Sequence, residues 1–235
     1  MIRKRLKFIT SITVLFGLIG FEPLIAAGHS RGMSRKVLQK TRNAIVEVVV
    51  PKRKDRTIYA DSIPKNAFHY AKRKDKFHSI GTAFFTGKNT LISAAHVFSL
   101  HKYQGYSHFY IRTTRGKIYK VQDITRYDMN RDIIEFNISG NIRGIKPLKM
   151  YSKYQLGAEV CAPGNARGEG ISIRCSGELA MRSKEPAAGR WLNLRFSTPA
   201  SLGNSGGPLI NRRGQVIGLV THKSPAENLN VALPS

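Results

Sequence analysis

The stretch GNSGGPL, which runs from Gly203 to Leu209, decides how the rest of this chain is interpreted. It places Ser205 on a turn with glycines on both sides, and glycine allows backbone conformations that a side chain would forbid. The turn also directs the backbone amides of Gly203 and Ser205 toward one point, as stabilisation of an oxyanion requires. The stretch therefore indicates a serine nucleophile. The alternative interpretation is a tight turn between two strands.

Two further strings weaken the alternative of a simple turn. The string LISAAHV over 91–97 is an apolar and β-branched run that closes with small residues and His96. The string NRDIIEF over 130–136 puts Asp132 at the start of an apolar run. A histidine and an aspartate are the residue types that activate a serine hydroxyl for attack on a carbonyl group. Asp128 is the main rival of Asp132, but it precedes the apolar run instead of starting it.

The order His96, Asp132, Ser205 and the three strings resemble the chymotrypsin-like serine peptidases, in particular the protease domain of the bacterial HtrA/Deg type. The resemblance runs from about Val37 to the end of the chain, where NVALPS is similar to the last barrel strand of that family. It implies an all-β fold of two six-stranded antiparallel Greek-key barrels with the active site between them.

The resemblance also implies a role for each residue. Ser205 would be the nucleophile, His96 the general base and Asp132 the group that orients His96, while the amides of Gly203 and Ser205 would form the oxyanion hole. The residues expected to line the substrate pocket are Pro199, Ala200, Thr221 and Lys223. Pro199 stands where trypsin-like specificity needs an acid, so we expect a small or aliphatic residue before the cleaved bond. The alternative is that Lys223 attracts an acidic side chain at the position before the cleaved bond.

Two departures from the family patterns limit what the resemblance implies. Asn204 stands where the trypsin branch has an aspartate that pairs with a new N-terminus, so activation by N-terminal insertion is not expected. Little sequence follows the second lobe, so we expect no PDZ domain and do not carry over the trimeric assembly of HtrA proteases.

Short β-branched and apolar runs separated by turn residues predict an all-β protein. We expect the first barrel lobe over 33–140 and the second over 141–235, with a short helix over 33–43 and a long basic surface loop over 51–79. Strands are predicted at 44–50, 80–85, 90–94, 109–113, 117–123, 132–137, 159–162, 171–179, 192–196, 208–210, 216–221 and 229–232.

The N-terminus carries the features of a secretory signal peptide. Basic residues precede an apolar run over 8–21, and small residues at 26–28 offer a cleavage site, so residues 1–27 are predicted to be removed. The apolar run has about 14 residues, fewer than the roughly 20 needed to span a bilayer. Export to the periplasm or secretion is therefore expected, with an uncleaved membrane anchor as the alternative.

Export bears on the only two cysteines, Cys161 and Cys175, because an oxidising compartment permits a disulfide. Both fall in strands expected to form one hairpin. The alternative is a pair of reduced core thiols. No further metal ligands flank the two cysteines, so we expect no metal site, and the proposed chemistry needs no cofactor.

The chain of 235 residues carries a formal net charge of +25. Clusters of lysine and arginine at 52–56 and 72–76 suggest binding to an anionic surface such as lipid headgroups, polysaccharide or nucleic acid. The alternative is a solvated basic surface with no specific partner. We predict an exported serine endopeptidase that acts on protein or peptide substrates. The alternative is a restricted or inactive peptidase fold that binds anionic partners.

Overall fold

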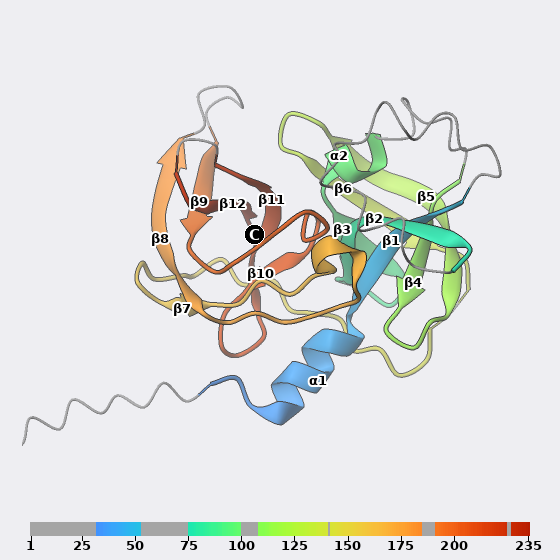
Figure 1. Ribbon diagram of the computed structural model, residues 1–235, viewed down its shortest axis with the longest axis horizontal. Coiled ribbons are helices and arrows are strands. Elements are labelled where there is room, and N and C mark those ends of the chain that lie inside the picture. Colours follow the sequence, from blue (N-terminus) through green and yellow to red (C-terminus); the bar gives the residue numbers. More distant parts are fainter. Residues whose placement is uncertain (1–31, 53–74, 100–107, 141, 185–190, 225–226) are drawn as a thin grey trace, which may run out of the picture. The chain divides into compact units, whose positions relative to one another are not determined.

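Two antiparallel sheets of six strands each form the body of the protein in a computed structural model (Figure 1). The residues described are 32–52, 75–99, 108–140, 142–184, 191–224 and 227–235. The predicted signal peptide and most of the basic loop lie outside these ranges. Within them, no helix is both long and apolar enough to cross a membrane.

The first sheet closes into a barrel with the order β1-β2-β3-β6-β5-β4. Closure comes from β4, which pairs with β1 from Val46 opposite Thr113 to Val49 opposite Tyr110. Its strands are β1 (Ile45–Pro51), β2 (Phe77–Phe85), β3 (Thr90–Ser93), β4 (Tyr110–Thr113), β5 (Ile118–Asp128) and β6 (Ile133–Ile138).

The second sheet has the order β10-β11-β12-β9-β8-β7 and is nearly closed. Cys161, which directly follows β7, exchanges two backbone hydrogen bonds of 2.9 Å with Ile210 of β10 across the remaining gap. Its strands are β7 (Glu159–Val160), β8 (Gly177–Lys184), β9 (Leu192–Phe196), β10 (Pro208–Ile210), β11 (Val216–Lys223) and β12 (Asn230–Pro234). The predicted class of two six-stranded antiparallel barrels is thereby confirmed.

In the described part of the chain, three short helical segments accompany the sheets: α1 (Arg35–Asn43), α2 (Ala95–Ser99) and the 3-10 turn η2 (Ala166–Gly168). Helix α1 begins after Ser34, whose hydroxyl accepts a hydrogen bond from the amide of Val37 at 3.4 Å, as N-cap residues do. Helix α2 follows β3 directly and carries His96.

Alternation of side chains along the strands divides the apolar residues between the barrels and the layer that joins them. Val46 of β1 and Phe85 of β2 point into the first barrel, while their neighbours Ile45 and Phe84 point outward. The outward residues pack against residues of the second barrel, namely Cys161, Ile210, Val216, Leu219 and Leu233. This apolar layer lies between the barrels and excludes water from their junction.

A buried ion-pair cluster fixes the start of β2 to the first barrel. The Arg112 guanidinium of β4 contacts the carboxylates of Glu47 and Asp75, each at 2.5 Å. Burial lowers the pKa of the Arg112 guanidinium, but the two carboxylates more than offset this effect, and its pKa is raised above the ordinary value for arginine. The residue therefore stays charged, and Asp75 anchors the chain where it returns from the basic loop.

Three strands have boundaries that differ from the predicted ones by three residues or more. β2 begins at Phe77, inside the segment predicted as loop. β5 continues to Asp128, beyond the predicted end at residue 123. The prediction missed this part because it is largely exposed, and an exposed strand shows no alternating pattern of apolar residues. The strand predicted over 171–179 begins only at Gly177, because residues 171–176 form one isolated bridge, between Ser172 and Gly164, instead of a regular ladder.

Candidate active site

A histidine and an aspartate from the first barrel contact each other directly. Nδ1 of His96 lies 2.7 Å from Oδ2 of Asp132, and Oδ1 of Asp132 accepts a hydrogen bond of 2.8 Å from the backbone amide of His96. Both carboxylate oxygens are thus engaged, so the orientation of the imidazole ring is fixed. With Nδ1–H donating to the carboxylate, Nε2 is left with a lone pair that can accept a proton.

Asp132 reaches His96 from a strained turn between β5 and β6. Its φ of 54° is a left-handed conformation, which aspartate tolerates better than most side chains. Asp128, the rival aspartate, accepts a hydrogen bond of 3.1 Å from the amide of Arg131 and so stabilises the same turn. The structure brings Asp132, and not Asp128, to the histidine.

The turn that carries Ser205 is tight and depends on glycine. Gly203 has a φ of 97° and Gly206 a φ of 82°. A Cβ atom on Gly206 would overlap the carbonyl oxygen of Thr82 and the hydroxyl of Ser93. Because Ser93 lies three residues before His96, this close approach packs the serine turn against the segment that carries the histidine.

Thr82 of β2 holds the serine turn from the first barrel, and sequence reasoning missed it. Its amide donates to the carbonyl oxygen of Ser205 at 2.9 Å, and its hydroxyl donates to the carbonyl oxygen of Gly203 at 2.6 Å. The same hydroxyl accepts a hydrogen bond of 3.0 Å from the amide of Asn165. One sequence signal could have pointed to it: Thr82 is the one hydroxyl residue in the otherwise apolar run over 80–85.

The Ser205 hydroxyl donates to the carbonyl oxygen of Thr221 at 3.0 Å, and within the described residues no hydrogen bond joins it to His96. The two segments are nevertheless neighbours. A Cβ atom on Gly81 would lie 2.6 Å from a methyl group of Val97 and 3.2 Å from the carbonyl oxygen of Ser205. Rotation about the Cα–Cβ bond of Ser205 would turn the hydroxyl away from Thr221.

Two backbone amides of the serine turn differ from their neighbours in their hydrogen bonding. Within the ranges that the structure describes, the amides of Gly203 and Ser205 donate to no protein group, whereas those of Asn204, Gly206 and Gly207 donate to backbone carbonyls. The Asn204 side chain points inward and donates to the carbonyl oxygen of Ala162 at 3.3 Å.

The four residues predicted for the substrate pocket differ in burial. Pro199 and Lys223 are exposed, Ala200 packs against the core of the second barrel, and Thr221 is buried. Thr221 is the member whose contact with the serine is established, through its carbonyl oxygen. The pocket itself therefore stays a prediction.

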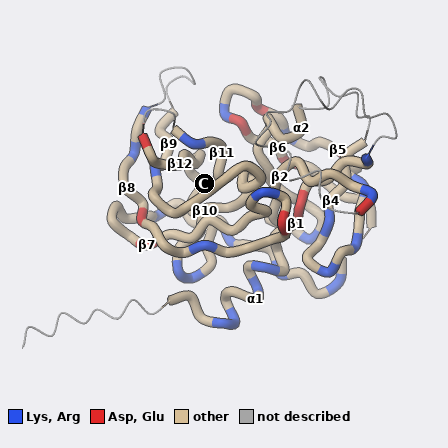
Figure 2. Tube along the Cα trace, in the orientation of Figure 1, with Lys and Arg blue, Asp and Glu red and all other residues tan. Residues whose placement is uncertain are grey.

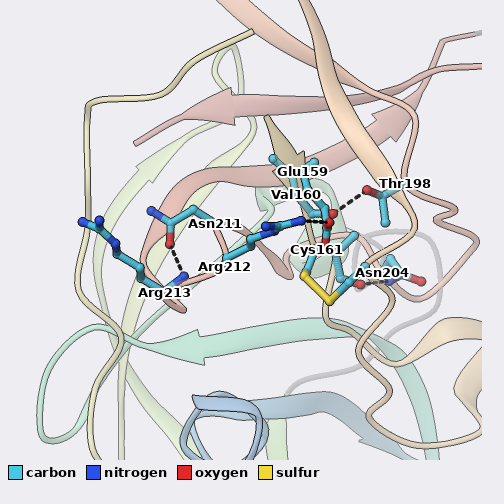
Figure 3. The surroundings of a disulfide bond; sticks show 10 residues. Glu159, Val160, Cys161, Thr198, Asn204, Asn211, Arg212 and Arg213 are labelled. Atoms are coloured by element: carbon cyan, nitrogen blue, oxygen red, sulfur yellow. Dashed lines mark hydrogen bonds and ion pairs between the residues drawn. A yellow bond between two sulfur atoms is a disulfide. The ribbon is translucent and has the colours of Figure 1, made fainter. Parts of the chain in front are cut away.

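Figure 3 shows the disulfide that joins Cys161 and Cys175, whose Cα atoms lie 4.1 Å apart. Contrary to the prediction, the two residues are not in regular strands: Cys161 follows β7, and Cys175 lies in the irregular segment before β8. Nearby, Arg212 contacts Glu159 at 2.5 Å, and the hydroxyl of Thr198 donates to the carbonyl oxygen of Val160 at 2.8 Å.

Lysine and arginine positions are spread along the traces of both barrels (Figure 2), and the chain has 39 lysines and arginines against 14 acids. The segment proposed to bind an anionic surface, between Lys52 and Lys76, lies for the most part outside the described residues.

Comparison with known proteins agrees with this fold. Residues 81–219, more than half of the chain, match the sequence family described as the trypsin-like peptidase domain. The anti-sigma-I factor RsgI9 of Acetivibrio thermocellus is 25% identical over 122 residues, which are 51% of this chain and 16% of that protein. This chain thus spans only a small part of that relative.

Two solved structures share the fold at low sequence identity. The active form of the Rv3671c protease from M. tuberculosis has a TM-score of 0.64 and 18% identity, over 85% of this chain and 79% of that one. The HtrA-type protease AlgW with a decapeptide has a TM-score of 0.66 and 16% identity, over 85% of this chain and 63% of that one.

Proposed function

Because this chain belongs to the family of trypsin-like peptidase domains, we propose that it is an exported serine endopeptidase that uses Ser205, His96 and Asp132. The observation that carries the proposal is the contact between His96 and Asp132, in which both carboxylate oxygens are engaged. This contact leaves Nε2 of the histidine available, and the serine turn packs against the same segment.

The proposed reaction begins when the Ser205 hydroxyl leaves the Thr221 carbonyl and attacks the carbonyl carbon of the substrate. His96 accepts the hydroxyl proton on Nε2 and delivers it to the leaving amine, while Asp132 stabilises the imidazolium. An acyl-enzyme forms, and His96 deprotonates a water molecule that attacks the ester carbonyl. The ester bond to Ser205 then breaks, His96 returns the proton to the Ser205 oxygen, and the acid product leaves. The free amides of Gly203 and Ser205 bind the negative oxygen in both tetrahedral intermediates.

Export is supported by the disulfide between Cys161 and Cys175, because disulfides persist in oxidising compartments. A signal peptide over residues 1–27 would direct the chain there. Protein or peptide chains are the proposed substrates. We prefer a peptidase to a binding module that uses its basic surface, since His96 and Asp132 are arranged for proton transfer and such an arrangement has no use in binding alone.

Labelling with a fluorophosphonate probe tests the proposal, because the probe reacts only with an activated serine. The wild-type protein should be labelled and should cleave an unfolded protein substrate, and Ser205→Ala should do neither. Ser201→Ala is the matched control, since Ser201 is an exposed serine of the same loop, and it should be labelled like the wild type. Equal labelling of Ser205→Ala and the wild type would contradict the proposal.

A further inference from the structure

A cation–π contact joins the two barrels beside Asp132. The guanidinium carbon of Arg131 lies 4.3 Å from the centre of the Trp191 ring. Arg131 precedes Asp132 in the turn between β5 and β6, and Trp191 directly precedes β9 of the second barrel. Both side chains are exposed, and 41% of the surface of Trp191 is accessible to solvent. An exposed aromatic ring that carries a cation on its face is otherwise unexplained by the packing of either barrel.

The hydrogen bonds of the turn that bears Asp132, including those of its carboxylate with His96, lie within the first barrel. Asp128 accepts a hydrogen bond from the amide of Arg131, and the amide of Asp132 donates to the carbonyl oxygen of Met129 at 3.2 Å. Both bonds lie within the turn and do not fix its position relative to the second barrel. The Arg131 side chain is the part of the turn for which a contact with the second barrel is established.

We propose that Arg131 and Trp191 are positioning residues, which hold the Asp132 turn against the second barrel and so keep His96 aligned with Ser205. The inference rests on the proposed function for its effect on catalysis. Small errors in the alignment of a reacting pair are costly, because catalytic rates depend steeply on the geometry of approach. Loss of the contact should therefore slow acylation more than it weakens substrate binding.

The first test is a double-mutant cycle on acylation. Arg131→Ala and Trp191→Ala should each lower kcat about three- to tenfold with little change in KM for a small peptide amide substrate, with which acylation limits turnover. The double variant should be no slower than either single variant, because the same contact is lost in all three. Trp191→Phe, which keeps an aromatic face, should recover part of the rate. Thermal unfolding of each variant shows whether it is folded.

A matched control is available in the second barrel. Arg182 lies over the ring of Tyr154 at 5.8 Å, in a contact of the same kind that involves the second barrel alone. Arg182→Ala removes the same charge from an equally exposed position and should leave kcat unchanged. An equal loss in Arg182→Ala, additive losses in the cycle, or a change confined to KM would each overturn the proposal.

A second measurement does not depend on activity. Trp191 is the only tryptophan of the chain, so its fluorescence reports on this one contact. In Ser205→Ala, which lacks the nucleophile, the additional change Arg131→Ala should alter the emission of Trp191 and increase its quenching by acrylamide, while Arg182→Ala should do neither. Unchanged fluorescence would refute the contact. If fluorescence responds but the wild type is never labelled by the fluorophosphonate, the proposed function fails while the contact stands.

Discussion

The hydroxyl of Thr82 lies 2.6 Å from the carbonyl oxygen of Gly203 and donates a hydrogen bond to it, from the first barrel to the serine turn of the second. The amide of the same residue donates to the carbonyl oxygen of Ser205. One strand residue thus restrains the carbonyl groups of the two residues that flank Asn204, and the conformation of the turn depends on how the two barrels dock.

Replacing Thr82 by valine tests this relationship. Valine keeps the shape of the side chain but leaves the buried carbonyl of Gly203 and the buried amide of Asn165 without a partner, at a cost of roughly 1–3 kcal/mol each. We expect a lower Tm and a value of kcat/KM reduced about tenfold or more. The control is Thr90→Val, which removes a hydrogen bond of 3.1 Å to Asn137 within the first barrel and should spare activity. Equal activity in both variants would count against a role for Thr82.

Replacing Asp132 by asparagine should abolish most of the activity. If the asparagine oxygen accepts from the His96 backbone amide, its NH2 group faces Nδ1 and donates to it. His96 is then held in the wrong tautomer, and kcat should fall by about 10⁴-fold. Asp128→Asn serves as the comparison, because Asp128 stabilises the turn without touching the histidine, and it should lose less than about tenfold. Steady-state kinetics on one ester substrate measure both, and the opposite ranking would reassign the aspartate.

Reversal of the charge at Lys223 should change specificity if this residue borders the substrate pocket. For Lys223→Glu, cleavage after acidic residues should fall relative to cleavage after basic residues by about fivefold, since exposed charges interact by roughly 1 kcal/mol at short range. A peptide set that varies only the residue before the cleaved bond gives the ratio. Lys184→Glu, an exposed site on β8, changes the net charge equally and should leave the ratio unaltered.

Removal of the disulfide should lower stability. The bond closes a loop between residues 14 apart in the sequence, and such a loop contributes about 3 kcal/mol in the chain-entropy description. We expect Cys161→Ser/Cys175→Ser to unfold at a lower urea concentration than the wild type, and reduction of the wild type to have the same effect. Thiol titration of the denatured, non-reduced protein should find no free thiol; two free thiols would show that the bond does not form.

Stability should fall as the pH drops below about 6.5, in part because of His78. Burial lowers the pKa of His78 below its ordinary value of 6.5, nearby Lys52 lowers it further, and Asp75 partly opposes both. Between the lowered pKa and 6.5 the unfolded chain binds more protons at this site, so the free energy of unfolding rises with pH across that window. His78→Gln should flatten this dependence in urea titrations between pH 5 and 8. An identical slope in both proteins would refute the assignment.

Much of the fold was predictable because it depends on local patterns. Alternating apolar residues predicted eleven of the twelve strands at nearly their observed places, from Ile45 to Pro234, since a half-buried strand must present one face to the core. The exception was β8, where the disulfide at Cys175 and an isolated bridge replace a regular ladder. The extent of β5 also escaped prediction, because its exposed end carries no pattern.

The sequence by itself determined the family, the barrel architecture and the order of His96, Asp132 and Ser205, because these depend on short motifs that can be recognised without knowing their spatial neighbours. The tertiary structure alone decided that both carboxylate oxygens of Asp132 engage His96, that Thr82 holds the serine turn, and that Arg131 lies over Trp191. His96 and Asp132 are 36 positions apart in the sequence, and Thr82 and Gly203 are 121 positions apart. Such pairs come together only when the barrels close and dock, so the conformational preferences of short segments do not predict these contacts.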